Sequence, residues 1–70
     1  MVTVKTFLEK LVEKGEVADT RGVQLKKEGT DEVVMYMRIS ALLDSGSEVL
    51  GKEYGSLAEE KDILTVYFKA

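Results

Sequence analysis

Carboxylates are the most numerous reactive side chains in this sequence, with thirteen Asp and Glu residues in a chain of 70. Acid–base catalysis by two carboxylates needs a pair that flanks a cleft at about 5–10 Å. The chain has no His and no Cys, which removes the usual general base, the commonest metal ligand and a thiolate nucleophile. No base neighbours a serine to activate it. We predict that the protein is not an enzyme, and we expect no cofactor and no metal site.

One short segment, Asp44-Ser45-Gly46-Ser47-Glu48, sets oxygen ligands around a glycine. Calcium loops bring three or more carboxylates to one point in a longer segment. The composition Asp-Ser-Gly-Ser is instead typical of a hairpin turn between two extended segments. We therefore expect a turn here.

Aromatic and basic side chains alternate with apolar ones in the strand-like segments. If Met35, Met37 and Ile39 face the core, the residues between them face outward. The same choice on neighbouring strands gives one outward set: Lys26, Tyr36, Arg38, Lys52, Tyr54, Tyr67 and Lys69. Rings that stack on bases and cations that follow phosphates are typical of single-stranded nucleic-acid binding. The net charge of −3 disfavours this alternative, because binding to phosphates is dominated by charge.

The same strands carry more apolar side chains than one helix can cover. Val34, Tyr36 and Leu42 share the outward side of one strand, and Ile63 and Tyr67 share that of another. A strand that is apolar on both faces is enclosed by its own fold or covered by another chain. We predict a protein-binding module that self-associates through its sheet as a homo-oligomer. The predicted interface residues are Val34, Tyr36, Arg38, Ile63 and Tyr67.

An N-terminal helix is the clearest element that could position these strands. Its apolar stripe follows helical spacing and consists of Val4, Phe7, Leu8, Leu11 and Val12. Thr3 is a suitable N-cap, and Gly15 is a suitable C-terminal cap. We predict a helix over about residues 3–14.

The rest of the chain has the two-residue periodicity of strands, interrupted by turn residues. A capping-box spacing between Ser56 and Glu59 predicts a single helical turn before the last strand. The predicted strands cover about residues 16–20, 22–28, 32–43, 48–54 and 63–69, and the helical turn covers about 57–61. The strand at 16–20 rests on Val17 and Ala18 alone.

These elements predict a single α+β domain over residues 1–70, with the helix packed on a strongly curved four- or five-stranded antiparallel meander. The element order resembles that of Sm-like barrels, which implies a small SH3- or Sm-like barrel as one form of the fold. The signature Asp-x-x-x-Asn of that family is absent, and Glu60-Lys61-Asp62 stands where the family has Arg-Gly. The resemblance therefore covers topology and implies no RNA site.

The composition is that of a globular chain, with 44% hydrophobic and 33% charged residues. No apolar run approaches 18 residues and no leader precedes the helix, so we expect a cytoplasmic protein without a membrane partner. Few amides, no Cys and many Lys and Glu are typical of a heat-adapted or designed sequence. A stable stand-alone domain without an inferable activity is thus a further alternative.

Overall fold

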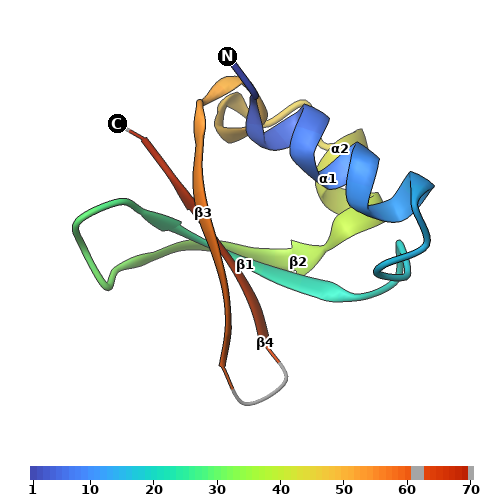
Figure 1. Ribbon diagram of the computed structural model, residues 1–70. Coiled ribbons are helices and arrows are strands. Elements are labelled where there is room, and N and C mark those ends of the chain that lie inside the picture. The colour runs from blue at the N-terminus through green and yellow to red at the C-terminus, as the bar shows by residue number, and fades with distance from the viewer. Residues whose placement is uncertain (61–62, 70) are drawn as a thin grey trace.

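The computed structural model describes residues 1–60 and 63–69. Its elements are α1 (Val4–Glu13), β1 (Gly22–Lys27), β2 (Val33–Arg38), α2 (Ile39–Asp44), the 3₁₀ helix η1 (Glu48–Gly51), β3 (Tyr54–Glu60) and β4 (Ile63–Phe68). The strands form one open sheet in the order β2-β1-β4-β3. Figure 1 shows α1 and α2 together on one side of this sheet. The predicted α+β class with an N-terminal helix is confirmed.

Helix α1 begins and ends as its sequence predicts. The backbone N–H of Thr6 donates to the side-chain oxygen of Thr3 at 3.2 Å, which caps the first turn. Gly15 adopts φ 74°, and the N–H groups of Gly15 and Glu16 donate to carbonyls of the last turn at 3.0 and 3.1 Å. These two hydrogen bonds form a Schellman motif. The predicted helix over 3–14 is therefore confirmed in position and in both caps.

Strands β1 and β2 form an antiparallel hairpin, and the predicted strand over 22–28 is confirmed as β1. Gly29 adopts φ 86° in the turn, a conformation that favours glycine because it has no Cβ. The backbone N–H and the hydroxyl of Thr30 both donate to the Lys27 carbonyl, at 3.1 and 2.9 Å.

A β-bulge near the start of β2 changes the direction of its side chains. Leu25 pairs with Met35, but the next residue, Lys26, pairs with Val33, so Val34 is the extra residue. Directly opposite residues point to the same face. Val33 therefore shares the face of Lys26, whereas Met35 shares the face of buried Leu25.

The predicted strand over 32–43 is wrong in its second half, because the chain enters helix α2 after β2. The backbone N–H of Ile39 donates to the Arg21 carbonyl at 3.0 Å, which anchors the first turn of α2 beside β1. Ile39 and Leu42 are three residues apart and both are fully buried, as one helix face requires.

The predicted strand over 48–54 is also wrong, because η1 and a short link occupy most of it. Val49 and Leu50 are adjacent and both are buried, whereas successive residues of a strand point to opposite faces. The turn at Gly46, which has φ 67°, therefore joins α2 to η1 rather than two strands.

The predicted strand over 63–69 is confirmed as β4, and two weaker predictions are wrong. Residues 16–20 form no strand. Residues 57–60 belong to β3 rather than to a helical turn, and residue 61 lies outside the described residues. Leu57 pairs with Val66 of β4, and this cross-strand pairing overrides the local capping signal.

The sheet is mixed and open, so the predictions of a purely antiparallel meander and of a closed barrel are wrong. The central strands β1 and β4 run parallel, and an antiparallel neighbour flanks each of them. A parallel pair needs a long crossover, and α2 and η1 lie within the chain that joins the two hairpins. Strands β2 and β3 remain as separate edges.

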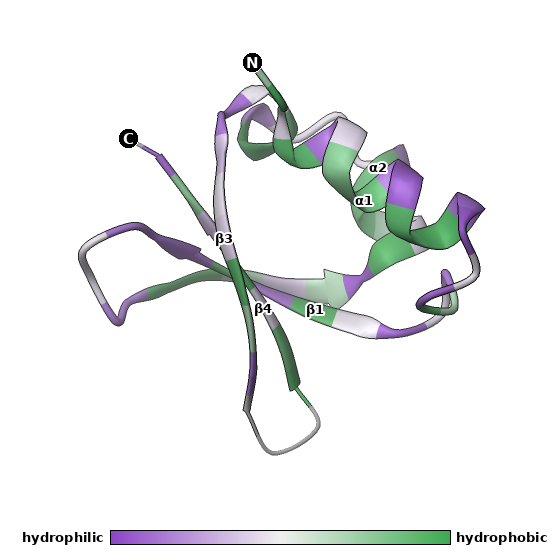
Figure 2. Ribbon diagram, viewed as in Figure 1, coloured by the Kyte–Doolittle hydropathy of each residue, from purple (hydrophilic) through white to green (hydrophobic). Residues whose placement is uncertain are grey.

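The core lies between the helices and one face of the sheet, called the inner face below. Its buried apolar residues are Val4, Leu8, Val23, Leu25, Ile39, Leu42, Val49, Leu50, Leu64, Val66 and Phe68. Figure 2 shows these apolar stretches along both helices and the central strands. The sequence predicted that Leu42 lies on the outward side of a strand, where another chain would cover it. The structure instead buries Leu42 fully within one copy of the chain.

Candidate interaction surface

The β2 edge, defined as Val33–Arg38, gathers exposed apolar side chains. Six large apolar side chains are exposed among the described residues, and three of them lie here: Val33 at 46%, Val34 at 52% and Tyr36 at 59% exposed. Within residues 1–60 and 63–69, no backbone hydrogen bond outside the strand ladders involves β2. Alternate residues of an antiparallel edge strand direct their N–H and C=O groups away from the sheet. The edge thus combines hydrogen-bonding groups with apolar side chains.

The opposite edge of the sheet is partly covered by the N-terminal segment. Thr3 forms an isolated antiparallel bridge with Glu53. The N–H of Tyr54 donates to the Val2 carbonyl at 2.8 Å, and the N–H of Val4 donates to the Lys52 carbonyl at 2.9 Å. The start of β3 therefore already has a neighbouring strand segment, unlike β2.

The outer face of the sheet is the face opposite the helices. Register places its residues in two rows across the four strands: Tyr36, Gln24, Thr65 and Ala58 in one, and Val33, Lys26, Tyr67 and Ser56 in the next. Thr65 is only 1% exposed, and the amide of Gln24 donates to its hydroxyl at 3.4 Å. The middle of the outer face is therefore closed within a single chain, and exposure increases toward both edge strands, β2 and β3.

Tyr36 is exposed but is packed against the backbone on one side. A Cβ added at Gly22 would lie 2.7 Å from the Tyr36 hydroxyl oxygen, so the ring end rests over this glycine. A ring held in place before binding loses less conformational freedom on association. The Tyr36 side chain therefore combines an exposed surface with a ring end that is held against the backbone.

The five predicted interface residues do not all fall on one face. Tyr36 and Arg38 are exposed on the outer face, and Ile63 and Tyr67 are half-buried on the same face. Val34 is the bulge residue and lines a pocket on the inner side. The structure thus brings four of these side chains to one face and sets Val34 apart.

The predicted nucleic-acid set is also divided. Lys26, Tyr36, Arg38 and Tyr67 share the outer face. The Nζ of Lys69 lies 3.0 Å from a carboxylate oxygen of Glu53. Its side-chain hydrogen bond to Glu53 and the negative charges of Glu53 and Glu28 raise the pKa of Lys69.

Lys52 and Tyr54 do not join that face. The ring of Tyr54 stacks on the ring of Phe7 from α1, with centroids 3.9 Å apart and planes at 14°. This stack ties α1 to the start of β3, so Tyr54 contributes to packing. Lys52 follows η1 and lies beside the pocket.

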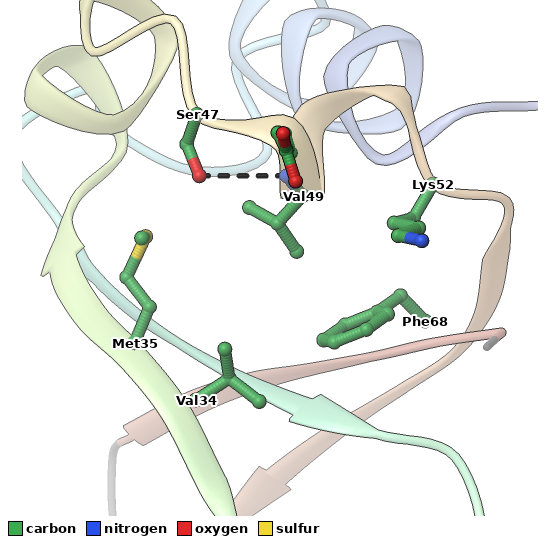
Figure 3. Close-up of a pocket in the computed structure, with 7 residues that line it drawn as sticks. Val34, Met35, Ser47, Val49, Lys52 and Phe68 are labelled. Atoms are coloured by element: carbon green, nitrogen blue, oxygen red, sulfur yellow. Dashed lines mark hydrogen bonds between the residues drawn. The ribbon is translucent and has the colours of Figure 1, made fainter.

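A pocket of about 270 Å³ opens between η1 and the end of the sheet. Figure 3 shows Val34 and Met35 of β2 facing Val49 of η1 and Phe68 of β4 across it. These four side chains are apolar, whereas Ser47, Glu48 and Lys52 add polar groups to the lining.

Sequence reasoning missed this pocket because it assigned η1 to a strand. The backbone N–H of Val49 donates to the side-chain oxygen of Ser47 at 3.4 Å, and Glu48 occupies the first turn. A serine before an acidic first-turn residue is a helix-start signal. That signal could have identified η1.

Two negative findings apply to the described part of the chain. No group of three or more His, Cys, Asp and Glu side chains there is arranged to hold a metal ion. No helix there has the length and apolar character needed to cross a bilayer. Comparison of the chain with protein-family models, curated proteins and solved structures finds no match in any of the three.

Proposed function

We propose that this chain is a non-enzymatic interaction module that binds protein through its sheet, with a second copy of itself as the partner. The observation that carries this proposal is the exposure of Val33, Val34 and Tyr36 on β2, which is an edge strand of the sheet. Association would remove these side chains from water and pair the edge hydrogen-bonding groups. A domain of this size buries a smaller share of the surface of its unfolded chain than a larger domain does, so association would also add to its stability.

The experiment that tests the proposal is the molar mass of the protein in solution over a roughly hundredfold concentration range. We expect the mass of the wild-type chain to rise from one to two copies. Replacing Tyr36 and Tyr67 together with alanine should raise the dissociation constant roughly tenfold or more, because aromatic anchors dominate such interfaces. Circular dichroism should show that the double variant remains folded.

Leu57→Ala provides the matched control, because Leu57 is an exposed apolar residue on the other edge strand. This variant should associate like the wild type. A wild-type chain that stays monomeric over the whole range contradicts self-association and leaves a stand-alone domain. A double variant that is unfolded at every concentration would assign the two rings to the core.

Single-stranded nucleic-acid binding is a second candidate, because register places Tyr36, Tyr67, Lys26 and Arg38 on one face. If this candidate holds, the wild type is retained on a single-stranded oligonucleotide column at about 50 mM salt and elutes steeply with added salt. Replacing Lys26 and Arg38 with glutamate should then abolish retention, whereas Lys5→Glu, on exposed α1 surface, should leave most of it. Absence of wild-type retention would remove this candidate.

A further inference from the structure

The direction of the backbone hydrogen-bonding groups along β2 follows from a contact at the end of the strand. The N–H of Ile39, the first residue of α2, donates to the Arg21 carbonyl at 3.0 Å, so it points toward the side of β1. In an antiparallel pair, residues whose N–H and C=O groups point toward the neighbouring strand alternate with residues whose groups point away from it. Counting back by twos from Ile39, Met37 and Met35 direct these groups to β1. Tyr36 lies between them and therefore directs its N–H and C=O away from β1, at the edge of the sheet.

The side chains of the same segment alternate between the two faces of the sheet. Met35 and Met37 lie opposite buried residues of β1, so they share the inner face. Tyr36 lies on the outer face. The regular part of β2 is limited to Met35–Arg38, because the bulge comes before it and α2 follows it.

An antiparallel contact between two copies of β2 has a two-fold axis that sets one residue opposite itself. With Tyr36 at the axis, the Tyr36 N–H of each copy can donate to the Tyr36 carbonyl of the other, because both groups point outward from the edge. Met35 of each copy then lies opposite Met37 of the other, on the inner face. These opposed pairs are uncharged and each shares a face. The regular ladder ends where Arg38 of one copy reaches the bulge of the other.

The other axes within the regular part of β2 conflict with the strand pairing or with the charges. An axis at Met35 would set Met37 opposite Val33, which lies on the outer face because of the bulge. An axis at Met37 would set Met35 opposite Ile39, where α2 has already replaced the strand. An axis at Arg38 would set two like charges opposite each other, which is destabilising.

We propose that two copies of this chain join their β2 edges antiparallel about a two-fold axis at Tyr36, with Met35 of each copy opposite Met37 of the other. This inference rests on the proposed function and specifies its contact. Val33 and Tyr36 are exposed and share the outer face, so the contact would shield apolar side chains on both faces from water. The Arg38 side chains of the two copies lie at opposite ends of the contact, about 13 Å apart along the strand direction, so like charges stay apart.

Single cysteines test this register, because the chain contains no Cys of its own. Opposed residues that exchange no hydrogen bonds have Cα atoms about 4.5 Å apart, within the roughly 4.4–6.8 Å that a disulfide spans. Met35→Cys is mixed with an equal amount of Met37→Cys and treated with oxidised glutathione at a concentration where the wild type is dimeric. We expect a disulfide-linked dimer, and non-reducing electrophoresis measures its yield.

Each cysteine variant alone is a matched control. In the proposed register, position 35 of one copy lies diagonal to position 35 of the other, and position 37 likewise, at about 7–8 Å. The yield from either variant alone should therefore be at least about fivefold below that of the mixture. Met35→Cys mixed with Leu57→Cys, on the other edge strand, gives the background from collisions. Circular dichroism and light scattering under reducing conditions verify that each variant is folded and dimeric.

Amide hydrogen exchange tests the same contact in the wild type, without any substitution. The N–H of Tyr36 should exchange about tenfold or more slowly once the dimer dominates, because it then donates to the other copy. The N–H of Met37 already points to β1 and serves as the internal reference, whose exchange rate should change much less. An unchanged exchange rate at Tyr36 in a dimeric sample would overturn the proposed axis.

The outcomes separate this inference from the proposed function. A wild type that remains monomeric overturns both. In a dimeric wild type, a high yield from Met35→Cys alone or from Met37→Cys alone moves the axis to that residue and overturns the inference. Yields at background in the mixture also overturn it, because the two copies would then meet elsewhere. A high yield in the mixture alone supports it.

Discussion

Replacing Leu8 with alanine should lower the free energy of unfolding by about 2–5 kcal/mol. Leu8 is 0% exposed and, with Val4, supplies the two fully buried side chains of α1. Its removal deletes apolar contacts on the only long helix of the described residues and leaves a cavity. A small domain has a total stability of about 5–15 kcal/mol, so the loss is a large fraction of the whole. Urea unfolding followed by circular dichroism measures it.

Leu57→Ala is the matched control, because it removes the same atoms as Leu8→Ala but from a side chain that is 40% exposed. We expect this control to change stability by less than about 1 kcal/mol. Equal losses in the two variants would contradict the assignment of Leu8 to the core. Both variants should be compared at low protein concentration, because association would stabilise the folded chain.

The elements that the sequence predicts well are those whose local signals agree with each other. In α1, the helical stripe, the Thr3 cap and the Gly15 terminator all indicate one helix, and the hydrogen bonds of the structure match them. Strands β1 and β4 have alternating apolar residues between turn residues. Agreement among independent signals makes such segments predictable from sequence.

The segment from Ile39 to Gly51 was mispredicted because its local pattern fits two periods. Ile39 and Leu42 satisfy helical spacing, but alternation from Val33 to Ala41 also continues a strand. Where β2 gives way to α2, the backbone N–H of Ile39 donates to the Arg21 carbonyl and that of Ser40 donates to the Asp19 carbonyl, and no local window contains these contacts. The parallel pairing of β1 with β4 was missed for the same reason, because it depends on this helical crossover.

The residues of the candidate surface could be predicted from the sequence only where the face to which each strand residue points could be predicted. Tyr36, Arg38, Ile63 and Tyr67 reach one face because β2 is regular beyond its bulge and β4 is regular throughout. Val34 was misplaced because a bulge adds one residue and reverses the alternation on one side of it. Such a bulge leaves no signal in a run of two adjacent valines.

A second bulge lies in β3 at Gly55, and Gly55→Ala should lower the free energy of unfolding by about 1–3 kcal/mol. Tyr54 pairs with Phe68, and Ser56 pairs with Tyr67, so Gly55 is the extra residue. An added Cβ would lie 2.9 Å from the backbone carbonyl oxygen of Tyr67. Because that carbonyl belongs to β4, relief of the contact requires the paired strands to separate locally.

Gly51→Ala is the matched control for this prediction, because it makes the same chemical change where space is free. No heavy atom lies within 4 Å of an added Cβ at Gly51, and its φ is outside the left-handed region. Alanine there restricts the unfolded chain and should leave stability unchanged or raise it by up to about 1 kcal/mol. The denaturant midpoint of Gly55→Ala should therefore fall below that of the wild type, whereas the midpoint of Gly51→Ala should stay the same or rise. Equal midpoints would show that the bulge accepts a side chain, and the glycine at 55 would then have no steric role.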